Sequence, residues 1–215
     1  MADQRFAYLV DDDEAVRRSI GFMLRNSGIE VTSYASGHAF LKDAKTLAPG
    51  AVLLDMRMPE MDGLEVQQLL NKRGVTLPVI VLTGHGDVSV AVQAMKAGAV
   101  DFIEKPFEKT VLLTAITRAE EQLERSHERF SAEREALLRV AVLTSREQDV
   151  LRELARGHPN KTIAYDLGIS PRTVEVHRAN LMSKLGARSL SEALRIAFAA
   201  QLSADEHRPS IDPHM

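Results

Sequence analysis

One aspartate stands out because it ends a short apolar run. Residues 51–54 are apolar and lead directly into Asp55, and Pro59 and Gly63 follow at positions that suit a loop and then a helix start. A run that is apolar on both faces is typical of a buried parallel strand. Ligands in open α/β sheets sit outside the carboxyl ends of the strands, so we expect Asp55 at a rigid strand end facing a crevice. A helix-capping aspartate is the alternative for this segment taken alone.

Other polar residues follow apolar runs in the same half of the chain. They are Asp11 and Asp12 after residues 5–10, Thr83 at the end of residues 78–83, and Lys105 after residues 100–103. The carboxyl ends of parallel strands share one edge of a sheet. Three carboxylates, a hydroxyl and an ammonium would therefore converge at that edge.

Such a group of residues could hold Mg²⁺ and accept a phosphoryl group. Neighbouring carboxylates repel one another and need a counter-charge, which a hard divalent cation supplies. Asp55 could attack a phosphoryl group to form an acyl phosphate, while Mg²⁺, Lys105 and Thr83 neutralise charge on the transferring oxygens. The alternative is a set of unrelated helix caps and surface charges, and we expect that simpler role for Asp13 and Glu14.

The elements that would position these residues alternate between strand and helix. Strands are expected at residues 5–10, 29–34, 51–55, 78–83 and 100–103. Helices are expected between them: one with Val16, Ile20, Met23 and Leu24 on one face, a short one capped by Ser36, residues 64–73, residues 88–97, and a long helix after Pro106. Five such alternations predict a doubly wound, flavodoxin-like α/β fold around a parallel sheet.

The composition limits the class of protein. The chain has 215 residues, enough for one large or two small domains, and is 45% hydrophobic and 27% charged, as is usual for globular proteins. The absence of cysteine excludes disulfides and thiolate metal sites. The N-terminus lacks a signal-peptide pattern, and no window is apolar enough for a transmembrane helix. We therefore expect a cytoplasmic protein without a membrane partner.

Charge is distributed unevenly along the chain. Residues 1–120 carry 13 Lys+Arg and 16 Asp+Glu, a balance of −3, whereas residues 144–200 carry 9 Lys+Arg and 6 Asp+Glu, a balance of +3. A basic C-terminal part joined to an acidic N-terminal part suggests that only the C-terminal part contacts nucleic acid.

The C-terminal part has the spacing of a helix-turn-helix. A capping box at Thr144 and Glu147 starts one helix, residues 161–167 form a short second helix, and Gly168 allows a tight turn. Residues 171–185 form a third helix that proline opens, and a last helix follows Ser189. This layout predicts a small all-α domain whose third helix can enter a major groove. A helical bundle that contacts only protein is the alternative.

A helical linker is expected between the two parts. Residues 108–142 contain no glycine or proline, and Ile116, Leu123, Phe130 and Leu137 are each seven residues apart, which is the repeat of a coiled coil. The paired positions are poor, because Ser126 and Glu133 are polar. A weak coiled coil and a solvated linker helix therefore remain open.

The first half resembles the receiver domain of two-component response regulators, in their FixJ branch. The segments that match are VDDDE at 10–14, LLDMRMPEMDG at 53–63, VLTGHGD at 81–87 and AMKAGAVDFIEKPF at 94–107. The resemblance implies that Asp55 accepts phosphate from a sensor histidine kinase and that Mg²⁺ binds Asp11, Asp12, Asp55 and the backbone carbonyl of Arg57.

The same resemblance assigns roles to further residues. Lys105 would pair with the phosphoryl oxygens, and Thr83 and Phe102 would form a switch pair. Many receivers have tyrosine where this chain has Phe102, so no phenol hydrogen bond can form here. Arg57 and His85 lie at positions that influence phosphate lifetime in the family, although an exposed loop histidine is an equal interpretation for His85.

Residues 143–185 resemble the LuxR-type DNA-binding domain. The resemblance implies that residues 171–185 are the recognition helix. Candidates for phosphate contacts are Lys161, Thr162, Arg172, Thr173, His177, Arg178 and Lys184, and candidates for base edges are Glu175, Val176 and Ala179.

Together these features predict a transcription regulator that phosphorylation switches. We expect a receiver at 1–120, a helical linker at 121–143, a DNA-binding domain at 144–202 and a disordered tail at 203–215. The resemblance implies a homodimer on phosphorylation, bound to promoter DNA, with RNA polymerase as a partner. The alternatives are an interaction adaptor and a phosphohydrolase that uses Asp55; the latter usually has an acid where this chain has Arg57.

Overall fold

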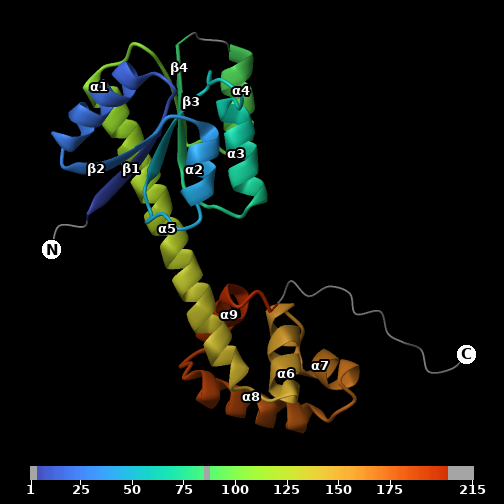
Figure 1. The fold of residues 1–215 in the computed structure, drawn as a ribbon. Helices are drawn as coiled ribbons and strands as arrows, with labels where there is room; N and C mark the ends of the chain where they lie inside the picture. The colour runs from blue at the N-terminus through green and yellow to red at the C-terminus, as the bar shows by residue number, and fades with distance from the viewer. Residues whose placement is uncertain (1–3, 85–87, 203–215) are drawn as a thin grey trace, which may run out of the picture. The chain divides into compact units, whose positions relative to one another are not determined.

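The structure is a computed structural model that describes residues 4–84 and 88–202 (Figure 1). The chain divides into two compact units, Met1–Ser126 and His127–Met215. His85 and the predicted tail at 203–215 lie outside the described residues. None of the helices in the described ranges is both long and apolar enough to cross a membrane.

The first unit contains a five-stranded sheet in which every neighbouring pair of strands is parallel. The strands are β1 (Arg5–Val10), β2 (Ile29–Tyr34), β3 (Ala51–Asp55), β4 (Val79–Thr83) and β5 (Asp101–Glu104). Their order is β2-β1-β3-β4-β5, with β3 in the centre, which is the flavodoxin-like order. The doubly wound fold expected from the sequence is thus confirmed. The last two strands, β4 and β5, each start one residue later than expected.

Helices cover both faces of this sheet. They are α1 (Glu14–Arg25), α2 (Gly37–Asp43), α3 (Gly63–Lys72), α4 (Val88–Lys96) and α5 (Lys109–Ala141). The buried residues form one core cluster that joins α2, α3 and α4 to one face of the sheet and another that joins α1 and the start of α5 to the opposite face.

The two faces follow from the two-residue period of the strands. In β3, Val52 and Leu54 belong to the core under α2, α3 and α4, whereas Ala51 and Leu53 belong to the core under α1 and α5. Each of these four residues is fully buried. A strand that is buried on both sides needs an unbroken apolar run, which is why the segment before Asp55 contains no polar residue.

Local signals fix the helices that border the strand ends. Asp13 caps α1, because its Oδ1 accepts the Ala15 amide at 2.7 Å, which confirms the capping role expected for it. Gly63 opens α3 directly behind β3. A Cβ at Gly63 would lie 2.5 Å from the carbonyl oxygen of Asp55, so only glycine lets this helix start so close to the strand.

The second unit is a helical domain. It contains α6 (Ser145–Ala155), α7 (Asn160–Asp166), α8 (Pro171–Leu185) and α9 (Leu190–Ala199), together with the last turns of α5. Ser170 caps α8 by accepting the Thr173 amide at 3.0 Å, and Gly186 ends it in the left-handed conformation at φ 63°. The bounds of α8 are those that the sequence predicts.

The long helix α5 contributes residues to the cores of both units. Ile116 and Ala119 are fully buried in the first unit, and Ala136 and Val140 are buried in the core of the second. The segment predicted as a linker at 121–143 therefore contributes part of the second unit's core. The stripe of four apolar residues cannot act as one continuous coiled-coil seam, because Ile116 already packs inside the first unit.

Candidate functional site

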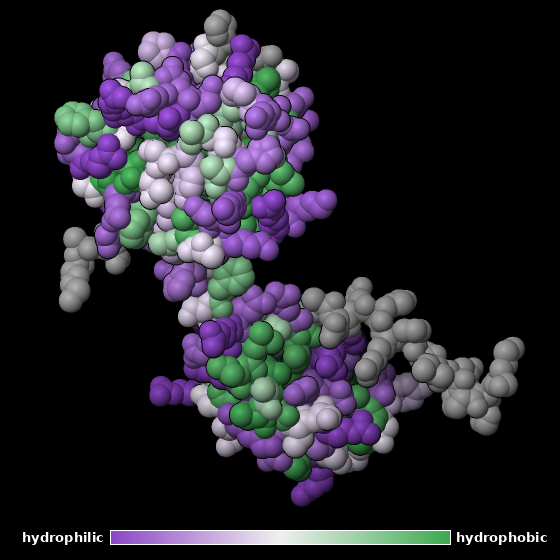
Figure 2. Space-filling view, in the orientation of Figure 1, coloured by the Kyte–Doolittle hydropathy of each residue, from purple (hydrophilic) through white to green (hydrophobic). Residues whose placement is uncertain are grey.

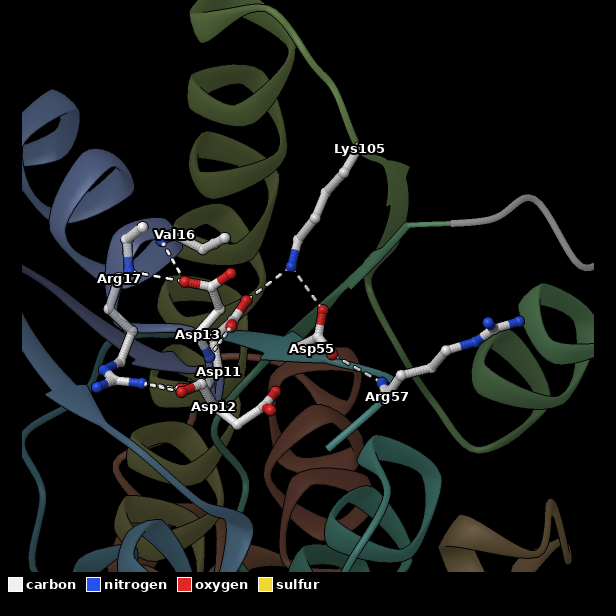
Figure 3. Close-up of polar contacts among 9 residues, drawn as sticks. Asp11, Asp12, Asp13, Val16, Arg17, Asp55, Arg57 and Lys105 are labelled. Atoms are coloured by element: carbon white, nitrogen blue, oxygen red, sulfur yellow. Dashed lines mark hydrogen bonds and ion pairs between the residues drawn. The ribbon is translucent and has the colours of Figure 1, made fainter. Parts of the chain in front are cut away.

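An ion pair that joins three strand ends is the centre of the first unit (Figure 3). The Lys105 Nζ atom lies 2.6 Å from Asp11 Oδ2 and 2.5 Å from Asp55 Oδ1. Asp11 follows β1, Asp55 ends β3 and Lys105 follows β5. The structure thus brings together residues that the sequence places 50 and 94 positions apart along the chain.

The acidic loop after β1 is held by its own backbone. Asp11 is only 1% exposed, and its Oδ1 accepts the Asp13 amide at 2.9 Å. The Arg17 guanidinium donates to the carbonyl oxygens of both Asp11 and Asp12 at 2.7 Å. Arg17 therefore fixes the loop without neutralising its carboxylates. The exposed Asp12 side chain lies beside the pair in Figure 3 and has no dashed contact there.

The Asp55 carboxylate is buried but well supplied with donors. It is 7% exposed, and its Oδ2 accepts the Arg57 amide at 2.7 Å. Burial raises the pKa of Asp55 above its usual range, although the hydrogen bond and charge of Lys105 oppose this rise. Figure 3 shows the Arg57 side chain pointing away from the carboxylate, so Arg57 reaches Asp55 only through its backbone.

Lys105 is the counter-charge to the two buried acids. Burial favours the neutral amine, but the hydrogen bonds to Asp11 and Asp55 outweigh burial and hold the pKa of Lys105 above its ordinary value. The ammonium is therefore charged at neutral pH. It can pair with whichever oxygens occupy this edge of the sheet.

The donor set of this edge suits a hard cation. Asp11, Asp12 and Asp55 offer carboxylate oxygens, which are the ligands that Mg²⁺ prefers together with water. These three carboxylates are not within 4.8 Å of one another; among the described residues that spacing occurs only for Glu153, His158 and Asp166 in the second unit. Two oxygens bound to one Mg²⁺ lie at most about 4.2 Å apart, so in this arrangement at least one of the three carboxylates would bind the ion through a water molecule.

The predicted switch residues lie on the face of the sheet that carries α2, α3 and α4. Thr83 is 3% exposed at the end of β4, and Phe102 lies on β5 beside Val81. Phe102 packs on the same core as Val81, and Thr83 follows Val81 by two residues, so all three side chains share one face. The switch role of Thr83 and Phe102 stays a prediction.

A cavity of about 550 Å³ adjoins Thr83. Its lining includes Asp12 after β1, Arg57 in the loop after β3, Asp62 before α3, Thr83 at the end of β4, and Val90 and Gln93 on α4. The end of β4 therefore borders open space on the side of α4.

The second unit presents most of the predicted DNA-contacting residues on α7 and α8. The exposed residues of this set are Lys161, Arg172, Glu175, Val176, Ala179 and Lys184. The half-buried residues are Thr162, Thr173, His177 and Arg178. Arg178 is held in place, because its guanidinium donates to Asn160 Oδ1 at 2.7 Å. These assignments to phosphates and bases stay predictions.

Lys184 has an internal partner that the sequence analysis missed. Its Nζ lies 2.7 Å from Glu147 Oε2, and the Glu147 residue is only 3% exposed. The hydrogen bonds from Lys184 and from the Thr144 backbone lower the pKa of Glu147 from 4.5 to about 2. Lys184 thus ties α8 to the start of α6, in addition to any contact with DNA.

Family comparisons agree with this architecture. Residues 7–117 match the family model of the response regulator receiver domain, and residues 141–197 match that of bacterial regulatory proteins of the luxR family. The chain therefore belongs to the response regulators that join a receiver domain to a LuxR-type DNA-binding domain. It is a two-component regulator of transcription, and the phosphohydrolase hypothesis is set aside because the family's members are regulators.

Relatives of the FixJ type span nearly the whole chain. The transcriptional regulatory protein FixJ of Rhizobium meliloti is 50% identical over 192 residues, which is 89% of this chain and 94% of the relative. The tetrathionate response regulatory protein TtrR of Salmonella typhimurium is 44% identical over 188 residues, which is 87% of this chain and 89% of the relative. The FixJ-type resemblance inferred from the sequence is confirmed.

Solved structures show the same fold. The response regulator StyR matches with a TM-score of 0.71 and 39% identity, covering 91% of this chain and 98% of its own. Full-length FixJ from B. japonicum matches with a TM-score of 0.58 and 43% identity, covering 92% of this chain and 98% of its own.

The Glu147–Lys184 pair predicts a pH-dependent contribution to stability. Glu147→Gln should lower the free energy of unfolding at pH 7 by about 1–2 kcal/mol, because Lys184 loses its charged acceptor but is partly exposed and rehydrates. A carboxylate with a lowered pKa stabilises the fold above the unfolded value and loses that effect as the pH falls. The difference in unfolding free energy between the wild type and Glu147→Gln should therefore become smaller as the pH falls from 4.5 to about 2.

Urea unfolding of the full chain at several pH values measures this deficit. Glu192→Gln is the matched control, because Glu192 also lies in the first turn of a helix and accepts a backbone amide, from Arg188, without an ion pair among the described residues. A deficit that is equal for both variants, or that does not change with pH, would contradict the assignment.

Proposed function

We propose that Asp55 is the phosphoacceptor and that a sensor histidine kinase is the donor. The observation that carries the proposal is the Asp11–Lys105–Asp55 ion pair at the carboxyl edge of a flavodoxin-like sheet. Asp55 is the acid that ends the central strand, and the Lys105 ammonium already touches one of its oxygens. An ammonium in this position neutralises charge as the phosphoryl group is transferred.

Each neighbouring residue receives a role in this proposal. Asp11, Asp12, Asp55 and the backbone carbonyl of Arg57 hold Mg²⁺, which supplies positive charge for the phosphoryl oxygens when bound. The Arg57 amide holds Asp55 Oδ2, so that the other carboxylate oxygen faces Lys105. Thr83 and Phe102 then report the phosphoryl group to the α4 side of the sheet.

The second unit is proposed to bind promoter DNA through α8, with RNA polymerase as the later partner. A helix-turn-helix inserts its second helix in the major groove, and α8 offers exposed Glu175, Val176 and Ala179 along that helix. Glutamate can accept a hydrogen bond from cytosine, and valine or alanine can contact a thymine methyl group.

We place the receiver domain at 1–120 and the DNA-binding domain at 144–202, with the helical segment 121–143 between them. We place the protein in the cytoplasm, where the DNA is.

Dimerisation is proposed as the consequence of phosphorylation. In the first unit, Val92 and Met95 on α4 and Val111 on α5 are each nearly half exposed, although they are apolar. In the second unit, exposed apolar residues gather as well, and Figure 2 shows a broad apolar patch on it. Apolar groups of this kind mark surfaces that another chain can cover.

The phosphoacceptor assignment predicts a single labelled residue. With acetyl phosphate and Mg²⁺, the chain should gain one phosphoryl group on Asp55, and Asp55→Asn should gain none, because an amide cannot form the acyl phosphate. Intact-mass and peptide mass spectrometry measure the label. Asp43→Asn, an exposed acid at the end of α2, is the control and should label normally. Undiminished labelling of Asp55→Asn would disprove the assignment.

The DNA assignment predicts two kinds of variant. Arg172→Ala should weaken binding to every duplex and reduce the slope of log K against log salt by about one, because one phosphate contact is lost. Glu175→Ala should instead change the preferred sequence. Fluorescence anisotropy at several salt concentrations measures both, and Arg195→Ala on α9 is a control of equal charge. A change in preference without a change in general affinity for Arg172→Ala would refute this groove geometry.

Dimerisation and unmasking predict different behaviour of the isolated second unit. A fragment that starts at residue 127 keeps Ala136 and Val140, which belong to its core. If dimerisation carries the signal, this fragment should bind DNA weakly, and fusion to an unrelated dimer should raise its affinity roughly 10²–10⁴-fold. Equal affinity of the monomeric fragment and the phosphorylated full chain, at matched salt, would favour unmasking instead.

A further inference from the structure

Two amide side chains of α3 hold the end of α4. Gln67 Nε2 donates to the Ala94 carbonyl oxygen at 3.2 Å, and Asn71 Nδ2 donates to the Ala97 carbonyl oxygen at 2.7 Å. Gln67 and Asn71 are four residues apart and thus lie on one face of α3. We call this pair of contacts the amide clamp.

The clamp binds carbonyl groups that have no hydrogen-bond partner within the helix. The last carbonyls of a helix lack intrahelical partners, so they must find donors elsewhere. Ala94 O also accepts the Ala99 amide at 3.1 Å, and Ala99 begins the segment that leads into β5. Gly98, at φ 95°, makes the turn between them. The clamp therefore fixes the C-terminal end of α4 together with the entry to β5.

Gln67 is an unusual choice for this position. It is 1% exposed, and its Oε1 is, among the side-chain atoms of the described residues, the buried one without a hydrogen-bond partner. Turning the amide over would place that oxygen against the Ala94 carbonyl oxygen. One long hydrogen bond contributes modestly, and a buried oxygen without a partner costs at least as much, so Gln67 adds little net stability. A leucine would pack the same space without that cost.

The other end of α4 is in a different setting. Val90 and Gln93 line the cavity of about 550 Å³ that adjoins Thr83, so the part of α4 that precedes the clamped Ala94 carbonyl borders open space. A helix that is anchored at one end can turn about that end.

We propose that Gln67 and Asn71 are positioning residues that make the C-terminal end of α4 a pivot. When Thr83 moves toward the phosphoryl group, the first half of α4 turns into the cavity while the clamp holds Ala94 and Ala97. The clamp thereby converts a local movement at Thr83 into a defined rotation of the part of α4 that carries Val92, relative to Met95 at the pivot. This inference rests on the proposed phosphorylation of Asp55 and adds to it the residues that set the direction of the change.

The test compares Gln67→Leu/Asn71→Ala with Gln68→Leu, an exposed neighbour on the same helix. In the unphosphorylated full chain, the double variant should exchange the Ala99 amide at least tenfold faster than the wild type, as followed by hydrogen exchange. Its melting temperature should remain close to that of the control, because Gln67 is a poor stabiliser. Unchanged exchange at Ala99 would overturn the clamp, whatever phosphate does.

A second measurement separates positioning from structure. The gain in DNA affinity on treatment with acetyl phosphate and Mg²⁺ should fall about tenfold in the double variant, while labelling of Asp55 stays complete. A full gain in the double variant would overturn the pivot. Absence of labelling in the wild type would instead overturn the proposed function, and the exchange result would still decide whether the clamp exists.

Discussion

The first unit depends on the attraction between one ammonium and two buried carboxylates. Asp11 and Asp55 lie at neighbouring strand ends with almost no access to water, and two such charges could not stay there unpaired. Lys105 supplies the counter-charge from the end of β5 and so holds the chain segments after β1, β3 and β5 close together. Because the pair is made of charges rather than packed apolar groups, an incoming anion or cation can reorganise it. That property suits a site that must change state when it gains a phosphoryl group.

The two faces of the sheet in the first unit differ in how they are packed. Under α1 and the start of α5, one apolar core cluster covers the sheet, and α5 continues beyond that cluster as one helix. On the other face, the sheet borders a cavity at Thr83, and α4 is fixed at its C-terminal end by amide contacts. The parts that we propose to respond, Thr83 and α4, thus lie beside a cavity, as expected for elements that move in signalling.

The sequence predicts most of the fold because its signals are local. The strand before Asp55, the capping box at Thr144 and the proline at the start of α8 each depend on residues a few positions apart. The convergence of Asp11, Asp55 and Lys105 was predicted, because each residue stands at the end of a strand signal. Other contacts were not predicted: Glu147–Lys184, Asn160–Arg178 and the amide clamp on α4 leave no periodic pattern. The seven-residue repeat on α5 has a partial explanation within the chain, since Ile116 packs in the core of the first unit. A coiled coil of the later positions stays a prediction.

We propose that the state of Asp55 controls DNA binding by the full chain. The most direct measurement is the affinity of the full-length protein for a duplex selected from a random pool, by fluorescence anisotropy, before and after treatment with acetyl phosphate and Mg²⁺. We expect a gain in affinity of roughly 10²–10⁴-fold for the wild type and none for Asp55→Asn. An equal gain in both proteins, or no gain in a fully labelled wild type, would contradict it.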